Sequence, residues 1–159
     1  MVWEKSKATG YLNAKKQPMR AHEDIVVFYH KQCTYNPQKT KGVPYDKGTA
    51  IRDSMTYAKQ TKAIHVKNDD GLRYPRSVQY FITAESEGKY HPTQKPIKLY
   101  EWLIKTYSNE NDLILDPCFG SGTTVIGCIN TNRSFIGFET NKEFYDKAIA
   151  RIETHLNKS

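Results

Sequence analysis

Two short apolar segments that each end in an acidic residue constrain the fold most strongly. They are Leu113–Asp116 (LILD) and Ser134–Glu139 (SFIGFE), and both have the length and composition of buried strands. Apolar residues at helical spacing precede the first segment over 96–107, lie between the two around 125–129, and follow the second from about 141. Helix–strand–helix–strand–helix with short turns predicts an α/β fold, with a parallel sheet covered by helices on both faces.

A glycine-rich turn follows the first predicted strand, at the edge where parallel sheets bind their ligands. The turn, Phe119–Thr124 (FGSGTT), contains no lysine, which argues against a phosphate-binding P-loop. Val125 stands where a dinucleotide fingerprint requires its third glycine. A nucleoside cofactor without phosphates is the remaining alternative, since Glu139 is placed to accept hydrogen bonds from ribose hydroxyls.

The first 90 residues have a less regular pattern. His22–Lys31 contains the run Ile-Val-Val-Phe-Tyr and predicts a buried strand, and Ser77–Ile82 predicts a second strand. Between them, residues 33–50 are rich in proline, glycine and lysine, which predicts irregular, exposed chain. Residues 50–75 are also polar and basic.

The excess positive charge is confined to this first part. Residues 1–90 hold 16 Lys and Arg against 9 Asp and Glu, a net charge of +7, whereas residues 91–159 hold 8 of each. Such a basic segment favours a polyanionic partner such as nucleic acid, with a solvated basic surface as the plain alternative.

The three cysteines, Cys33, Cys118 and Cys128, form neither a CxxC pair nor a cluster with zinc-ligand spacing. We therefore expect reduced thiols, no disulfide framework and no structural metal. The chain contains no apolar run long enough to cross a bilayer, and its first residues lack a signal-peptide core. We expect an intracellular protein without a membrane span.

Three strings resemble motifs of DNA adenine and cytosine amino-methyltransferases. Asp116–Thr124 (DPCFGSGTT) resembles their S-adenosylmethionine motif, and His91–Pro96 (HPTQKP) resembles the partner motif that closes the methionine end of the pocket. Arg133–Ile152 resembles their ribose-binding strand and following helix. The order is that of the circularly permuted class, in which the catalytic motif precedes the cofactor motif. The resemblance implies a Rossmann-like methyltransferase fold with an incomplete parallel-type sheet.

The resemblance extends into the first part of the chain and implies three regions. Trp3–Gln38 resembles the stretch just downstream of the catalytic motif in bacterial and phage adenine-specific members, and Lys67–Phe81 resembles the segment that enters HPTQKP. Residues 1–38 would then be strands of the methyltransferase core. Residues 39–90 would be a basic target-recognition segment that contacts DNA, and 91–159 the cofactor-binding subdomain.

Site residues carry over by position onto the family's motifs. The cofactor-binding residues implied by the resemblance are His91, Thr93, Lys95, Asp116, Phe119, Gly120, Ser121, Gly122, Thr123 and Glu139. Among them, Thr93 and Lys95 would hold the methionine carboxylate, and Glu139 would bind the ribose hydroxyls. For double-stranded DNA we expect contacts from Lys15, Lys16, Arg20, Arg73 and Arg76.

The family's catalytic motif, an Asp, Asn or Ser followed by Pro-Pro and Tyr or Phe, is absent from the 159 residues. None of the seven prolines is adjacent to another, and Asn36-Pro37-Gln38 lacks the second proline and the aromatic residue. We therefore expect no catalytic residue in these 159 residues. We expect a truncated or split DNA methyltransferase, with adenine as the favoured target base, that has no turnover on its own. The alternatives are a non-catalytic DNA- or cofactor-binding regulator or decoy, and a decayed remnant without activity.

Loss of the catalytic motif would also remove two or three strands and expose a sheet edge, which favours pairing. The expected partners are double-stranded DNA and either a polypeptide that carries the catalytic half or a second copy of the chain. The resemblance implies a role in restriction-modification and a cytoplasmic location in a bacterial or phage-infected cell.

Overall fold

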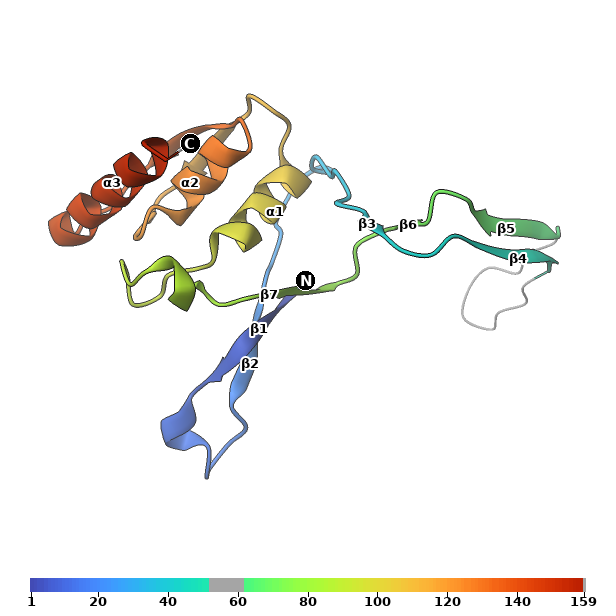
Figure 1. Ribbon diagram of the computed structural model, residues 1–159, viewed down its shortest axis with the longest axis horizontal. Coiled ribbons are helices and arrows are strands. Elements are labelled where there is room, and N and C mark those ends of the chain that lie inside the picture. The colour runs from blue at the N-terminus through green and yellow to red at the C-terminus, as the bar shows by residue number, and fades with distance from the viewer. Residues whose placement is uncertain (52–61, 159) are drawn as a thin grey trace. The chain divides into compact units, whose positions relative to one another are not determined.

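Three helices form where the apolar spacing predicts them (Figure 1). In the computed structural model, which describes residues 1–51 and 62–158, α1 spans Ile97–Tyr107, α2 spans Thr123–Asn130 and α3 spans Lys142–Leu156. Pro96 is the N-cap of α1, in keeping with the fixed backbone angle that proline brings to a helix start. The Asn141 side chain accepts hydrogen bonds from the backbone N–H groups of Glu143 and Phe144, which fixes the start of α3.

The two predicted strands with acidic ends are present and parallel. β8 spans Leu113–Asp116 and β9 spans Ser134–Gly137, with Leu113 opposite Ser134 and Asp116 opposite Gly137. β9 ends two residues earlier than predicted, so Glu139 lies just beyond the strand. Together with the three helices, this parallel pair confirms the predicted α/β class.

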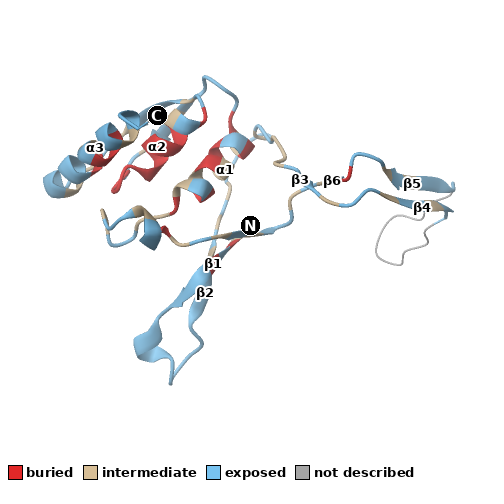
Figure 2. Cartoon of the chain, in the orientation of Figure 1, coloured by how far each residue is buried: buried red, intermediate tan, exposed pale blue. Residues whose placement is uncertain are grey.

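The core of this α/β part lies among the three helices (Figure 2). Val125, Ile126 and Ile152 form a buried cluster that joins α2 to α3. Gly127 allows α1 to approach α2, because a Cβ atom there would lie only 3.0 Å from Ile104 Cδ1. The helices thus pack on one another, and α2 also contacts β9.

The other face of the β8–β9 pair has no helical cover among the described residues. Leu113 and Leu115 alternate along β8 with less exposed neighbours, and they remain exposed together with Ile136 of β9. Helices on both faces of the sheet were predicted, but within residues 1–51 and 62–158 they cover one face only. The reason is that all three helices pack in a single layer.

A three-stranded sheet is built mainly from the start of the chain. β1 (Val2–Thr9) lies between β2 (Arg20–Asp24), to which it is antiparallel, and β7 (Val78–Phe81), to which it is parallel. The strand predicted over Ser77–Ile82 is confirmed as β7. The 3-10 helix η1 (Tyr11–Asn13) lies between β1 and β2, and η2 (Ala84–Glu87) follows β7.

The prediction of a buried strand over His22–Lys31 is wrong. Only its first residues, His22–Asp24, belong to a strand, the end of β2, and none of them is buried. Residues 25–29 join no strand, and Val26 and Phe28 are 66% and 90% exposed. Ile25 exchanges backbone hydrogen bonds with Met1, after which the described residues offer no neighbouring strand. An apolar β-branched run fits a buried strand, but burial also requires partner strands, which a local pattern does not reveal.

Residues 37–75 form a second unit, separate from the unit of residues 1–36 and 76–159. Its strands pair as β3 (Thr40–Lys41) with β6 (Leu72–Arg73), and β4 (Tyr45–Ala50) with β5 (Ile64–Asn68), both antiparallel. The prediction of irregular chain over 33–50 is therefore wrong for β3 and β4, because their pairing partners lie far along the sequence. Residues 52–61 of the predicted target-recognition segment, 39–90, lie outside the described residues.

Three further observations concern the described residues as a set. None of their helices is both long and apolar enough to cross a membrane. They contain no group of three or more His, Cys, Asp and Glu side chains arranged to hold a metal ion. Cys33, Cys118 and Cys128 are free thiols.

Candidate functional site

The glycine-rich turn after β8 is held by hydrogen bonds at both of its ends. Asp116 Oδ1 accepts a hydrogen bond from the Cys118 N–H at 3.0 Å, and Oδ2 accepts one from the Thr124 hydroxyl of α2. The Phe119 N–H donates to the Phe138 carbonyl, and the Phe138 N–H donates to the Asp116 carbonyl, both at 3.0 Å. The Asp116 carboxylate is therefore part of the framework that shapes the turn.

Two glycines give this turn its path. Gly120 and Gly122 have φ values of 51° and 74°, in the left-handed region that residues with a Cβ rarely adopt. Gly122 is the N-cap of α2, and a Cβ there would lie 3.1 Å from Ile152 Cδ1 of α3. The glycines therefore let the turn pass close to α3.

The His91–Pro96 segment lies against the turn, although the two motifs are well separated in the sequence. The His91 imidazole packs over Gly120, where a Cβ would lie 3.5 Å from the ring. The same ring meets Phe144 of α3 edge-on, with ring centroids 4.3 Å apart. Thr123 Oγ1 donates to the Lys95 carbonyl at 3.1 Å. The fold thus brings the partner motif and the glycine turn into direct contact.

A buried arginine that sequence reasoning missed ties these parts together. Arg151 of α3 donates to the Ser121 carbonyl at 2.9 Å and to Thr123 Oγ1 at 3.0 Å. It also forms an ion pair with Glu87 Oε2 at 3.0 Å. Its side chain is only 5% exposed, and this burial lowers the pKa of Arg151 while the Glu87 carboxylate opposes the shift. The sequence signal for this burial was that Arg151 is next to Ile152, which lies on the apolar side of the predicted last helix.

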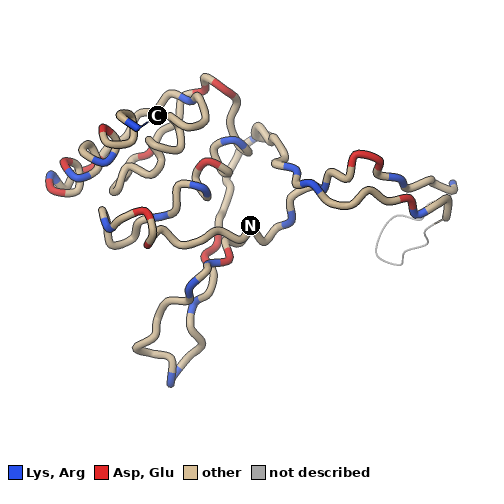
Figure 3. The backbone as a smooth tube through the Cα atoms, viewed as in Figure 1, with Lys and Arg blue, Asp and Glu red and all other residues tan. Residues whose placement is uncertain are grey.

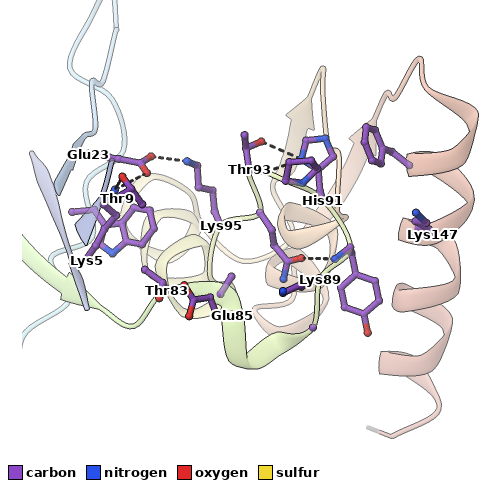
Figure 4. Close-up of a pocket in the computed structure, with 17 residues that line it drawn as sticks. Lys5, Thr9, Glu23, Thr83, Glu85, Lys89, His91, Thr93, Lys95 and Lys147 are labelled. Atoms are coloured by element: carbon purple, nitrogen blue, oxygen red, sulfur yellow. Dashed lines mark hydrogen bonds and ion pairs between the residues drawn. The ribbon is translucent and has the colours of Figure 1, made fainter. Parts of the chain in front are cut away.

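A cavity of about 610 Å³ opens beside the His91–Lys95 segment (Figure 4). Its described lining also includes parts of β1, η2 and α3. Gln94 lines this cavity, and its Oε1 accepts the Tyr90 N–H at 3.1 Å, whereas its buried Nε2 has no partner among the described residues. A buried amide donor without an acceptor is costly, so this group is suited to an oxygen atom of a ligand.

Thr93 and Lys95 already have partners at the edge of this cavity (Figure 4). The Thr93 hydroxyl lies 3.1 Å from His91 Nδ1, and Lys95 Nζ lies 2.5 Å from Glu23 Oε2 of β2. A second ammonium group, Lys5 Nζ, lies 3.6 Å from Glu23 Oε1. Partial burial acts to raise the pKa of Glu23, but the two lysines outweigh it and hold that pKa below its ordinary value.

Glu139, the predicted ribose ligand, is partly buried just beyond β9. Its Oε1 accepts the Asn141 N–H at 2.9 Å, at the start of α3. A carboxylate has two acceptor oxygens, so this single bond leaves capacity for a ligand hydroxyl. Neither Glu139 nor Asp116 is among the described residues that line the cavity beside His91. Both lie at the carboxyl end of the β8–β9 pair.

Four of the five predicted DNA-contacting residues lie on the unit that carries β1 and α3 (Figure 3). Lys15 and Lys16 lie in the exposed turn between β1 and β2, and Arg20 is exposed at the start of β2. Arg76 is exposed just before β7. Three of the four therefore share one hairpin, whose far end carries the two lysines.

The fifth, Arg73, lies in the unit of residues 37–75 and is engaged there. Its guanidinium donates to Asn68 Oδ1 at 2.8 Å and to the Gly71 carbonyl at 3.0 Å. It also lies over the Tyr45 ring, 4.7 Å from the ring centroid. Arg73 therefore has a structural role that joins β6 to β4.

The parallel β8–β9 pair, its glycine turn and the layer of helices define a Rossmann-like α/β protein. The family described as DNA methylase (N6_N4_Mtase) matches residues 1–150, and the chain belongs to this family. The match extends over the N-terminal hairpin and the unit of residues 37–75 as well as the glycine turn. It confirms the resemblance on which the site residues were assigned.

Comparison with individual proteins agrees with this membership. The chain is 34% identical over 138 residues to the type II methyltransferase M.HpaI of Haemophilus parainfluenzae. This alignment covers 86% of the chain and 40% of M.HpaI. It is 29% identical over 180 aligned positions to M.HindIII of Haemophilus influenzae, covering 99% of this chain and 55% of that protein. The chain thus spans about half the length, or less, of these relatives.

Two further comparisons involve a relative that matches over a shorter stretch and a solved structure. The chain is 40% identical over 80 residues to the DNA adenine methyltransferase YhdJ of Escherichia coli, covering 50% of this chain and 26% of that protein. The crystal structure of an M1.HpyAVI–SAM complex matches with a TM-score of 0.61 at 23% identity, over 96% of this chain and 60% of that one. That likeness confirms the predicted methyltransferase-type fold.

Proposed function

We propose that the chain is the S-adenosylmethionine-binding part of a DNA amino-methyltransferase, with adenine as the favoured target base. The observation that carries the proposal is the packing of His91–Lys95 against the turn Asp116–Thr124, with Glu139 just beyond the adjoining strand. Membership of the DNA methylase family supports it, as does the neighbour described as a SAM complex. The relative described as an adenine methyltransferase supports the preference for adenine.

The residues at this site fit such a cofactor. Glu139 keeps acceptor capacity for ribose hydroxyls, and Gln94 Nε2 offers an unpaired buried donor at the cavity. Gly120 and Gly122 give the turn its left-handed path and let it pack closely against His91 and α3. Thr93 and Lys95 would face the methionine carboxylate, in which case that carboxylate competes with Glu23 for the Lys95 ammonium.

Bound S-adenosylmethionine supplies a methyl group attached to a positively charged sulfur, which is transferred to the exocyclic amino group of a base. The base must be flipped out of the duplex, because its amino group is otherwise held in the base pair. The residues described above bind and orient the cofactor, but none of them is placed to position a base amino group. The Pro-Pro-Tyr type motif that would do so is absent from the 159 residues.

We therefore propose that these 159 residues bind the cofactor but do not complete the catalytic site by themselves. DNA binding would come from the hairpin that carries Lys15, Lys16 and Arg20, and from the unit of residues 37–75, which overlaps the predicted target-recognition segment 39–90. Lysines at the exposed end of a hairpin suit contacts with duplex phosphates, since each contact releases condensed counterions.

Calorimetric titration of S-adenosylmethionine into the purified chain tests the proposal. We expect saturable binding by the wild type and loss of at least about tenfold in affinity for Glu139→Ala, because two ribose hydrogen bonds are removed. Glu110→Ala, an exposed carboxylate in the turn before β8, is the matched control and should bind like the wild type. Absence of binding by a folded wild-type chain would reject the proposed cofactor site.

A non-catalytic regulator or decoy is a second candidate, favoured by the formed cofactor turn together with the lysines at the exposed end of the β1–β2 hairpin. The two candidates differ in what an added catalytic half would do. For a split enzyme, methyl transfer to duplex DNA should appear when the missing half of a relative such as M.HpaI is co-expressed with the chain. DNA binding without any transfer under those conditions would favour the regulator.

A further inference from the structure

The end of the β1–β2 hairpin presents two large apolar side chains to solvent. We call this end the tip and define it as residues 10–19, which lie between the last paired positions of the two strands, Thr9 and Arg20. Every residue from 6 to 22 is exposed. Leu12 and Tyr11 are 93% and 79% exposed, and Leu12 is the most exposed large apolar side chain among the described residues. Neither side chain therefore contributes to the core of the protein.

Backbone hydrogen bonds hold the tip in a definite conformation. Gly10 has a φ of 92°, in the left-handed region, which turns the chain out of β1. The Asn13 N–H donates to the Gly10 carbonyl and the Ala14 N–H donates to the Tyr11 carbonyl, both at 3.0 Å, which closes η1. The Asn13 carbonyl then accepts the Lys16 N–H at 2.9 Å. The two apolar residues are thus presented on a hydrogen-bonded turn.

The charge around the tip is entirely positive (Figure 3). Residues 5–22 contain five Lys and Arg and no Asp or Glu. Two of the five form ion pairs with carboxylates of the same unit. The other three, Lys15, Lys16 and Arg20, have no side-chain partner among the described residues. Three cations that flank an exposed apolar pair are suited to a polyanion that also offers flat apolar surfaces.

We infer that the tip is a wedge that opens the base stack of duplex DNA. Leu12 enters between two base pairs, Tyr11 stacks on a base that is exposed by the opening, and the three cations hold the adjacent phosphates. This inference rests on the proposed function, which supplies DNA as the partner. Apolar side chains inserted at a base step partly unstack it, and the added phosphate contacts offset the cost.

The size and composition of the tip favour DNA over other partners. One aliphatic wedge and one aromatic ring are enough to open a single base step, and the tip offers one of each. A membrane surface requires a broader apolar face, and a stable protein interface buries far more area than two side chains provide. None of residues 10–19 lines the cavity beside His91. The wedge is therefore separate from the proposed cofactor site.

Binding of an intact and an abasic duplex tests the wedge. In a duplex of the same sequence that lacks one base, the stack is already interrupted, so the wild-type chain should bind it at least about tenfold more tightly. Leu12→Ala should bind the two duplexes about equally, and Tyr11→Ala should lose part of the preference. Leu156→Ala, at an exposed leucine of α3, is the matched control and should keep the full preference. Fluorescence anisotropy of labelled duplexes measures the affinities.

A second comparison separates the wedge from the charge around it. Lys15→Ala with Lys16→Ala should weaken binding to both duplexes alike and reduce its dependence on salt, while the preference for the abasic duplex remains. Leu12→Ala should have the opposite effect, with an unchanged salt dependence and no preference. Both side chains are exposed, so thermal unfolding should be similar for all of these variants.

Each outcome decides for or against the wedge. Equal affinity of the wild type for the two duplexes, or a preference that Leu12→Ala retains, overturns it, and so does a chain that binds neither duplex. Binding to vesicles of anionic phospholipid that requires Leu12, without a preference for the abasic duplex, would make a membrane surface the partner and would also overturn it. Titration with S-adenosylmethionine is read independently, so the wedge can fail while cofactor binding persists, and the reverse.

Discussion

Arg151 Nη1 lies 3.0 Å from Thr123 Oγ1, inside the protein, and links the last helix to the first residue of α2. The same guanidinium holds the Ser121 carbonyl and the Glu87 carboxylate. A single buried side chain therefore fixes the end of the glycine turn relative to α3 and η2. Arg151 touches only protein atoms in this arrangement, which makes it a positioning residue for the turn.

Replacement of this arginine should destabilise the fold. Arg151→Met keeps much of the apolar stem but leaves Glu87 and the Ser121 carbonyl without their partner, and we expect a loss of about 3 kcal/mol in the free energy of unfolding. Urea denaturation measures the change. Lys147→Met, which removes an exposed ion pair with Glu143 on the same helix, is the control and should change stability little. Equal effects of the two variants would contradict the role assigned to Arg151.

The Glu23–Lys95 ion pair should make stability depend on pH in a defined direction. The pKa of Glu23 is held below its ordinary value in the folded chain, so the stabilisation is present above the unfolded pKa, near 4.5. It is lost as the pH falls through the lower folded value. The wild type should therefore exceed Glu23→Gln in stability at neutral pH, and the difference should vanish on acidification. Glu110→Gln serves as the control, and a difference that persists in acid would count against the ion pair.

The two glycines of the turn should differ in their response to alanine. At both, the left-handed backbone costs an L-residue about 1–2 kcal/mol. At Gly122 the added Cβ would also lie 3.1 Å from Ile152 Cδ1, whereas at Gly120 the nearest atom is 3.5 Å away, an ordinary contact. Gly122→Ala should therefore lose more stability in thermal unfolding than Gly120→Ala. Gly10→Ala, with φ of 92° and no atom within 4 Å, reports the backbone cost alone.

The hairpin lysines should contribute to DNA binding through charge. Lys15→Ala with Lys16→Ala removes two phosphate contacts, which should lower the slope of log affinity against log salt by about 1.8. Fluorescence anisotropy with a labelled duplex at several salt concentrations measures the slope. Lys105→Ala with Lys158→Ala makes the same change of charge elsewhere. If both pairs change the slope equally, the effect comes from net charge and the hairpin has no special role.

The cysteines should react in an order set by burial. Burial raises the pKa of the Cys128 thiol to about 11, whereas Cys118, just before the glycine turn, is exposed. Because the thiolate is the reactive form, iodoacetamide at pH 8 should label Cys118 in the folded chain and spare Cys128. Mass spectrometry locates the label, and Cys128 should become reactive only in denaturant. Early labelling of Cys128 would mean that the packing between α1 and α2 is looser than described.

The sequence alone was sufficient for the part of the fold that depends on local patterns. Apolar residues at helical spacing predicted the three helices, and the segments ending in Asp116 and Glu139 predicted the parallel pair. Such features depend on neighbours within one or two turns, or on the two-residue period of a strand, and are therefore visible in a linear pattern. The strings around His91 and Asp116 likewise identified the family before any contact between them was known.

Only the tertiary structure decided which side chains share an environment. It placed Arg151 on Ser121 and Thr123, paired Lys95 with Glu23, and left Gln94 Nε2 buried without a partner in the described chain. It also showed that the apolar run after Asp24 lies along a groove with Val26 and Phe28 exposed, where the sequence pattern had predicted burial. These relationships join residues that are far apart in the chain, and burial depends on which partner strands are present. A local pattern records how apolar a segment is, but it contains no information about what lies across from it.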